Sequence, residues 1–300
     1  MINTRPNFFI IGAAKSGTTS LANYLSQHPD IFIPETKEPK FFSLQDNIFP
    51  HRGPGDKIVD KRVIKNLEEY ERLFASASNA RAKGEASVDY LYFYKSAERI
   101  KLYNSDSKII IILRNPADRA FSAYMHMIKD GRETLPFNKA LREEKKRKNA
   151  NWEFFWLYKS LGFYYQQVKY YLECFGSKNV YVIIFEDFIQ NTKNIMEEVF
   201  TFLNVEYSFC PDLSVKHNIS GLPKNKFLHN FLNRNNIFKR YLKYMLPENF
   251  RKEIKKKISD NNLKKIKIPI NIYKRLLYEY ENDIKSLETI LGKNLEIWQQ

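Results

Sequence analysis

A short run of small and polar residues, Gly12 to Thr19, carries groups suited to holding an anion. Lys15 supplies an ammonium group, and Ser16 and Thr18 supply hydroxyls beside two glycines. Glycine allows tight turns and a close approach of the backbone to a ligand, and N–H groups at the start of a helix attract phosphate. The ATP-type phosphate loop has a lysine directly after its second glycine, but here Thr18 stands there. The run predicts an anion-binding loop with a displaced lysine, against the alternative of a plain strand-to-helix turn.

A second candidate grip follows the apolar run at residues 108–113. Arg114 ends this run, and Ser122 lies eight residues later. If a turn precedes a helix here, both side chains can reach one anionic group beside the helix N-terminus, where the helix dipole favours negative charge. Arg119 could join them or pair with Asp118. Arg114 taken alone could equally form a structural ion pair.

Residues that could hold a metal ion are sparse in this sequence. The five histidines are scattered, and neither they nor the two cysteines show the spacing of metal ligands. An enzyme that uses a nucleoside triphosphate normally has a carboxylate at the end of a neighbouring strand to help hold Mg²⁺, but the central strand here ends in Arg114. Glu186 and Asp187 are the rival candidates, and they fit a helix start equally well. The sequence favours a ligand with two separate anionic ends, bound without a metal.

Apolar runs alternate with amphipathic stretches along the chain, which predicts an α/β fold. Residues 8–11, 108–113 and 180–185 are typical of strands buried on both faces of a parallel sheet. Helices are expected at 18–28, 60–74, 96–103, 118–129, 136–148, 160–175 and 192–203, and over most of 224–300. The charged residues at 142–148 are expected to be a solvated helix face. With no repeat or linker evident, we expect residues 1–300 to form one domain with helices flanking a central parallel sheet.

The net charge of +15 is concentrated toward the C-terminus. From Lys216 onward there are nineteen Lys and Arg against eight Asp and Glu. The basic segment 224–300 would suit nucleic acid, an anionic membrane or a polyanionic substrate, but a solvated, lysine-rich helical surface is the preferred interpretation. No signal-peptide pattern and no apolar run long enough to span a bilayer are evident, and Cys174 and Cys210 fit reduced, buried thiols. We therefore expect a cytoplasmic protein.

These motifs resemble those of the sulfotransferases that use 3′-phosphoadenosine 5′-phosphosulfate (PAPS). The branch most similar acts on carbohydrates, as the heparan sulfate sulfotransferases and their bacterial relatives do, and the resemblance covers most of residues 7–225. It implies the P-loop-like nucleotide-binding fold of that family, with PAPS as co-substrate and no metal. In the family, the 5′-phosphosulfate is held by the loop that corresponds here to Lys15, Ser16, Gly17, Thr18 and Thr19.

The resemblance extends to the other end of the nucleotide. In the family, an R-x-P-x-x-R-x-x-S pattern binds the 3′-phosphate through its first arginine and its serine, here Arg114 and Ser122. Tyr164 belongs to a G-x-Y element near the cofactor. The segment 216–226 corresponds to a loop that closes over the nucleotide.

The resemblance also implies catalytic roles. In the carbohydrate branch a glutamate precedes an aromatic pair, as Glu38 does in the sequence Glu-Pro-Lys-Phe-Phe. Glu38 would deprotonate the acceptor during in-line attack on sulfur, and Lys15 would stabilise charge on the leaving phosphate. Alternatively, Glu38 is a surface carboxylate paired with a neighbouring lysine. Lys40 and Asp89 are candidates for lining the acceptor cleft. Aryl and alcohol sulfotransferases use a histidine instead, and no histidine here lies in a matching motif.

The sequence as a whole predicts a PAPS-dependent sulfotransferase that acts on a hydroxyl or amine, with a carbohydrate as the expected acceptor. One alternative is a kinase-like phosphoryl transferase, which the central strand ending in Arg114 opposes. The other is a non-enzymatic polyanion-binding protein that uses the basic C-terminal segment. No nucleic-acid partner is expected, whereas an acidic or already sulfated glycan would suit a basic groove.

Overall fold

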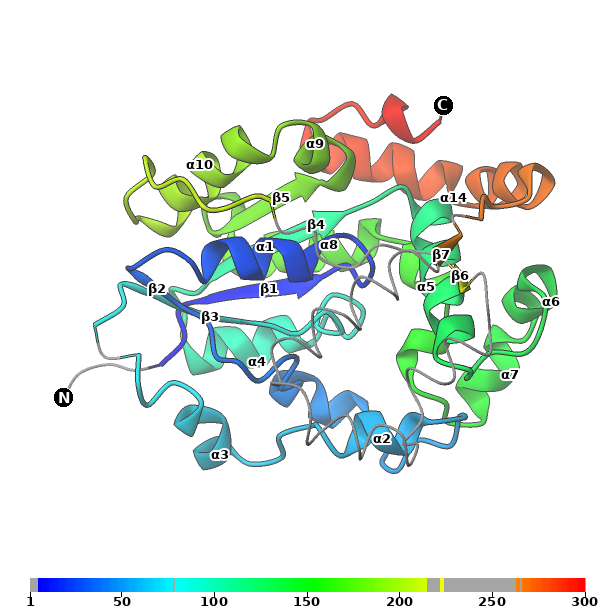
Figure 1. Ribbon diagram of the computed structural model, residues 1–300, viewed down its shortest axis with the longest axis horizontal. Coiled ribbons are helices and arrows are strands. Elements are labelled where there is room, and N and C mark those ends of the chain that lie inside the picture. Colours follow the sequence, from blue (N-terminus) through cyan, green and yellow to red (C-terminus); the bar gives the residue numbers. More distant parts are fainter. Residues whose placement is uncertain (1–4, 78, 215–221, 224–262, 265, 300) are drawn as a thin grey trace, which may run out of the picture.

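The computed structural model (Figure 1) describes residues 5–77, 79–214, 222–223, 263–264 and 266–299. Its centre is a five-stranded sheet in the order β2-β3-β1-β4-β5, in which all neighbouring strands are parallel. The strands are β1 (Phe8–Gly12), β2 (Ile31–Phe32), β3 (Ala82–Ala86), β4 (Lys108–Leu113) and β5 (Val180–Ile184). Helices lie on both sides of this sheet (Figure 1). The predicted fold class, a central parallel sheet flanked by helices, is confirmed.

Each face of the sheet carries its own apolar core, because successive side chains of a strand point to opposite faces. Ile109 and Ile111 of β4 pack on one face with α4 (Ser96–Tyr103), α8 (Tyr165–Phe175) and α14 (Ile270–Leu291). Ile110 and Ile112 pack on the other face with α1 (Thr18–Leu25), α9 (Phe185–Gln190) and α10 (Thr192–Leu203). Burial on both faces explains why the central strands are continuous apolar runs.

Further helices and 3₁₀ turns connect these elements. The α-helices among them are α2 (Asp56–Asp60), α3 (Leu67–Arg72), α5 (Pro116–Lys129), α6 (Phe137–Arg142) and α7 (Glu144–Asn149). The 3₁₀ turns are η1 (Phe41–Asp46), η2 (Phe154–Trp156), η3 (Ser160–Gly162), η4 (Ser177–Asn179) and η5 (Glu296–Trp298). A short antiparallel pair joins β6 (Leu222–Pro223) to β7 (Leu263–Lys264).

The single helix predicted at 60–74 is wrong. Asp60 ends α2, and its carboxylate accepts from the backbone N–H of His51 at 2.8 Å and contacts the His51 ring at 2.6 Å. The next helix, α3, starts only after Asn66, whose side chain accepts from the Glu69 amide at 2.8 Å. Asn66 is a better N-cap than the residues around it, so the chain starts a new, shorter helix there.

The prediction of a solvated face at 142–148 is wrong for two of its residues. Glu144 is buried and accepts from the hydroxyl and the amide of Ser160 at 2.7 and 3.0 Å. Arg147 is buried too, and it pairs with Glu133 at 2.7 Å. Both charges are buried because remote segments supply partners for them. The two thiols are free, but neither is buried: Cys174 is half-buried and Cys210 is exposed.

The described part of the C-terminal segment is mostly helical. The helix α14 packs against α5 and α8 and buries one face through Leu276, Tyr280, Ile284 and Leu287. Residues 224–262 lie outside the described residues, as does most of the loop 216–226 that was expected to close over the nucleotide. Among the helices described, none combines the length and the apolar character needed to cross a membrane. That residues 1–300 form one domain stays a prediction.

Candidate active site

The predicted anion loop connects β1 to α1. Gly12 and Gly17 have φ angles of 147° and 92°, and Lys15 also has a left-handed φ of 70°. A Cβ atom on Gly17 would lie 3.0 Å from the ring of Phe185, so both the backbone and the available space favour glycine. Ser16 is fully buried, and its Oγ has no hydrogen-bond partner within the described part of the chain. Because buried hydroxyls are normally bonded, this atom is available to an anionic ligand.

Arg114 comes directly after β4 and lies against the same loop. Its Nη1 donates to the carbonyl oxygen of Lys15 at 3.3 Å, and its guanidinium carbon lies 4.9 Å from the ring centre of Phe185. Its Nε is buried and has no hydrogen-bond partner among the residues described. Ser122 lies about two turns along α5, where it is mostly buried.

The sheet topology explains why these two loops meet. The strands β1 and β4 are neighbours, and the chain continues from β1 to the edge strand β2 but from β4 to the opposite edge strand β5. In open parallel sheets, ligands bind outside the carboxyl ends of the strands at such a switch point. Lys15 and Arg114 are 99 residues apart in sequence, and the topology brings them into contact.

Lys15 lies in an environment that is short of negative charge. Burial, followed by the charges of Arg114 and Lys129, lowers the pKa of Lys15 to about 8, while Asp130 and Glu38 act weakly in the opposite direction. A buried cation among other cations is stabilised when an anion binds beside it. The site around Lys15 is therefore built to receive negative charge.

Glu38 lies between β2 and η1, in a loop where it and Lys40 both have left-handed φ angles, of 51° and 55°. Lys40 Nζ lies 3.1 Å from Glu153 Oε1 and 3.7 Å from Glu38 Oε2. Burial disfavours the charge of Lys40, but Glu153, Asp89 and Glu38 outweigh it and raise the Lys40 pKa above its usual value. The side chain of Glu38 is 40% exposed, against 11% for Lys40. Glu38 is thus paired with a neighbouring lysine and still accessible.

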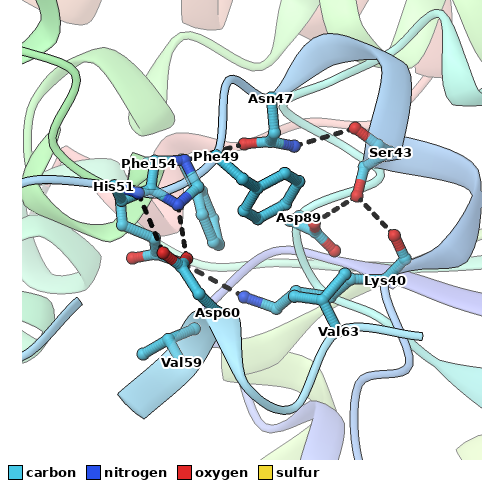
Figure 2. Close-up of a pocket in the computed structure, with 11 residues that line it drawn as sticks. Lys40, Ser43, Asn47, Phe49, His51, Val59, Asp60, Val63, Asp89 and Phe154 are labelled. Atoms are coloured by element: carbon cyan, nitrogen blue, oxygen red, sulfur yellow. Dashed lines mark hydrogen bonds and ion pairs between the residues drawn. The ribbon is translucent and has the colours of Figure 1, made fainter. Parts of the chain in front are cut away.

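Asp89 follows β3 and is buried beside Lys40. Its Oδ2 accepts from Ser43 Oγ at 2.6 Å, and burial raises its pKa to about 6 despite the opposing charge of Lys40. Figure 2 shows Asp89, Lys40 and Ser43 around one small pocket. The charge of Glu38 acts on both Lys15 and Asp89. The two groups of predicted residues, one around Lys15 and one around Lys40, therefore adjoin at Glu38.

Comparison with known proteins decides the family. The model of the sulfotransferase family matches residues 6–208, more than half of the chain. The chain belongs to the sulfotransferase family. A solved sulfotransferase from Alicyclobacillus acidocaldarius is 36% identical, and the two structures superpose with a TM-score of 0.79 over 99% of each chain. These matches confirm the resemblance and the sulfotransferase fold that were inferred from the sequence.

Curated relatives of this sulfotransferase include enzymes named for carbohydrates. Human carbohydrate sulfotransferase 15 is 23% identical over 246 residues, covering 67% of this chain and 44% of that protein. Human heparan sulfate glucosamine 3-O-sulfotransferase 3B1 is 24% identical over 201 residues, covering 67% of this chain and 46% of that protein. The chain thus spans less than half the length of these two relatives.

In this sulfotransferase the loop that carries Arg114 is anchored by residues from α9 and the C-terminal segment. Glu186 accepts from the backbone N–H of Asn115 at 3.0 Å and from Trp298 Nε1 at 2.8 Å. The side chain of Asn115 donates to the Trp298 carbonyl oxygen at 2.8 Å. Glu186 was the rival candidate for a metal-binding carboxylate, but both of its oxygens already hold this loop. Within the described ranges, no three His, Cys, Asp or Glu side chains group closely enough to hold a metal ion.

Two further residues of the motifs described above form hydrogen bonds to backbone carbonyl oxygens. The hydroxyl of Tyr164 donates to the carbonyl oxygen of Arg114 at 3.0 Å, so this side chain supports the backbone of the loop. A direct contact between Tyr164 and the cofactor stays a prediction. Arg119 is fully buried and donates to the carbonyl oxygen of Tyr158, a partner that the sequence did not indicate.

Sequence reasoning missed two residues of this site. Glu153 pairs with Lys40 across 113 positions of sequence, and its signal was a single acidic residue within an aromatic stretch. Phe185 was taken only as the end of a strand, but its ring contacts both Gly17 and Arg114. An aromatic residue placed where the edge strand β5 reaches the crevice is the signal that could have identified it.

Proposed function

We propose that this sulfotransferase uses PAPS as its sulfuryl donor. The observation that carries the proposal is a pair of buried hydrogen-bond donor atoms, Ser16 Oγ and Arg114 Nε, that have no partner among the described residues and lie on two loops that meet beside Lys15. Hydrogen-bond donors on two separate loops fit a nucleotide that has an anionic group at each end. The residues proposed to bind it are Lys15, Ser16, Gly17, Thr18 and Thr19 toward the 5′-phosphosulfate, Arg114 and Ser122 toward the 3′-phosphate, and Tyr164.

Glu38 is proposed as the general base and Lys15 as the group that stabilises the leaving phosphate. PAPS supplies the sulfuryl group when bound. Glu38 accepts the proton of the acceptor hydroxyl or amine while the new bond to sulfur forms and the bond from sulfur to the 5′-phosphate oxygen breaks. The Lys15 ammonium donates a hydrogen bond to the oxygen that gains charge. Two observations support this division of roles: the side chain of Glu38 is partly exposed, and its negative charge acts on Lys15.

A carbohydrate is the proposed acceptor class, and the names of the curated relatives support it. The basic segment 224–300 is a proposed contact for an anionic portion of the acceptor, and most of it lies outside the described residues. A cytoplasmic location likewise stays a prediction.

Calorimetry with 3′-phosphoadenosine 5′-phosphate (PAP) tests the donor proposal. We expect PAP to bind in the presence of EDTA and to bind more tightly than adenosine 5′-monophosphate, which lacks the 3′-phosphate. Arg114→Ala should weaken PAP binding and leave that of the monophosphate nearly unchanged, because only PAP has the group that Arg114 holds. Tight binding of ATP with Mg²⁺ and none of PAP would overturn the proposal.

A second measurement tests the base. Glu38→Gln should keep PAP affinity while turnover falls by ~10²–10⁴, the usual contribution of a general base. Turnover that is unchanged in this variant would remove Glu38 from the role.

A further inference from the structure

A small pocket lies on the acceptor side of the site, among η1, α2 and η2. Figure 2 shows Lys40 and Asp89 reaching into it from one side and His51 and Asp60 from the other. The pocket has a volume of about 10 Å³, which is roughly the space that one water molecule needs. It can therefore receive one small polar group of a ligand, such as a hydroxyl or an amine, but no ring.

Negative charge exceeds positive charge around this pocket. The ammonium group of Lys40 faces three carboxylates, those of Glu38, Glu153 and Asp89. Across the pocket, Asp60 contacts the His51 ring at 2.6 Å, which adds a further acidic group. A local excess of carboxylates repels a sulfate or carboxylate on an incoming ligand.

Asp89 supplies a second and independent observation. Only 1% of this residue is exposed, and its Oδ1 has no hydrogen-bond partner among the residues that the structure describes. An unsatisfied buried carboxylate oxygen is unfavourable, so a donor from a ligand would be stabilised there. Burial raises the pKa of Asp89 to about 6, and the charge of Lys40 opposes this shift.

Glu85, four residues before Asp89, is also a buried carboxylate, but its oxygens do have hydrogen-bond donors. Glu85 is 1% exposed, and it accepts from Tyr90 at 2.7 Å, Tyr70 at 3.3 Å and Ser87 at 2.6 Å. Burial raises the pKa of Glu85 to about 7 even with these three hydroxyl donors. Within the described part of the chain, both carboxylate oxygens of Glu85 thus have hydrogen-bond donors, whereas Asp89 Oδ1 has none.

We propose, on the basis of the sulfuryl transfer proposed above, that the Asp89 pocket is an acceptor subsite for a hydrogen-bond donor. Asp89 Oδ1 accepts from a hydroxyl or amine of the acceptor that lies next to the group deprotonated by Glu38. The favoured acceptor is uncharged or cationic at this point, and one with a sulfate or carboxylate beside the reacting group is disfavoured. This pocket thus distinguishes the protein from one that acts on an already sulfated part of a glycan.

Thermal unfolding of the full chain with simple sugars tests the subsite without knowledge of the natural acceptor. The probes are glucose, glucosamine and glucose 6-sulfate, each at ~100 mM and matched ionic strength, with and without PAP. Glucose or glucosamine should raise the Tm of the wild-type protein by about 1–2 °C, and the larger of the two shifts shows whether a hydroxyl or an amine is preferred. Glucose 6-sulfate should give a smaller shift.

Asp89→Asn should abolish these shifts and should itself raise or leave unchanged the Tm at pH 7, because it removes a buried charge with an unsatisfied oxygen. Glu85→Gln is the matched control: it should lower the Tm, since the amide nitrogen cannot accept from Ser87, and it should leave the sugar shifts intact. Three outcomes would overturn the subsite. The sugars could raise the Tm equally in the wild type and in Asp89→Asn, or neither glucose nor glucosamine could raise the Tm of the wild type. The third is a larger Tm shift with glucose 6-sulfate than with the other two sugars. Absence of a Tm shift with PAP alone would instead overturn the proposed donor.

Discussion

Lys15 and Lys40 lie on the two sides of the same site, and their surroundings are opposite in charge. Burial and the nearby Arg114 lower the pKa of Lys15 to about 8. Lys40 is more deeply buried than Lys15, yet its carboxylate neighbours raise its pKa, with Glu153 contributing most. The Lys15 side, where we propose that the sulfuryl donor binds (the donor side), therefore lacks negative charge until a ligand brings it. The Lys40 side, where we propose that the acceptor binds (the acceptor side), has more negative than positive charge. Lysine thus has two roles in this site: Lys15 is placed to bind an anionic ligand, and Lys40 neutralises carboxylates of the protein itself.

Alanine substitutions of the two lysines give the largest expected contrast. Lys40→Ala leaves the buried Glu153 without its cation, so the free energy of unfolding should fall by about 3–5 kcal/mol. Lys15→Ala removes a desolvated cation and should leave the free energy of unfolding nearly unchanged, while kcat falls by ~10²–10³. Urea unfolding and turnover assays separate the two effects. Lys40→Met, which keeps the apolar stem, checks that the loss of stability arises from charge. Equal destabilisation by both alanine variants would remove the contrast.

The pH dependence of PAPS use tests the donor side alone. Because the pKa of Lys15 in the free protein is about 8, its positive charge is lost as the pH rises through that value, so kcat/KM for PAPS should fall above pH 8, approaching about tenfold per pH unit. Lys15→Arg keeps its charge at high pH, so the decline should move to higher pH in that variant, whatever its absolute activity. A wild-type kcat/KM that rises steadily from pH 8 to 10 would show that Lys15 does not act as a cation.

Phe185 lets the donor side be weakened without any change of charge. Phe185→Leu removes the ring under Arg114, and since such contacts contribute roughly 0.5–2 kcal/mol, PAP should bind about 2- to 30-fold more weakly, with KM for the acceptor unchanged. The matched control is Phe202→Leu, because the ring of Phe202 lies 5.5 Å from Lys108 Nζ at the other end of the sheet. PAP affinity that falls equally in both variants would indicate a general loss of packing.

Trp298 gives the smallest expected effect on the donor side. Trp298→Phe keeps most of the buried ring but removes the N–H that donates to Glu186 at 2.8 Å. Glu186 still accepts from Asn115, so PAP binding should weaken by less than in Phe185→Leu, and calorimetry measures the difference. If PAP affinity fell further than in Phe185→Leu, the hydrogen bond between Trp298 and Glu186 would contribute more to PAP binding than the ring beside Arg114 does.

The positions of the residues on the proposed donor side were largely predictable from sequence, because each group directly follows an apolar strand. Lys15, Ser16 and the glycines follow one apolar strand, and Arg114 follows another, so the rule that ligands bind at the carboxyl ends of parallel strands was enough to bring them together. The central strands were equally clear, because burial on both faces leaves an unbroken apolar run.

The acceptor side was not predictable to the same extent, because its residues depend on long-range pairing. Glu153 comes 113 positions after Lys40, and no local pattern connects them. The same limitation made Arg147, which pairs with the distant Glu133, look like part of a solvated charge run at 142–148. The helix expected to start at Asp60 failed because the Asp60 carboxylate bonds to His51 instead of capping a helix. Contacts between distant segments decided each case.

The anchor of the Arg114 loop also has a consequence for the order in which the site forms during synthesis. A nascent chain emerges from its N-terminus, and folding follows that order. The anion loop at 12–19 emerges early, whereas Trp298 is made 183 residues after the Asn115 that it holds. A growing chain can therefore shape the first anion grip well before the second acquires its anchor, so competence to bind the full nucleotide should appear late on the ribosome.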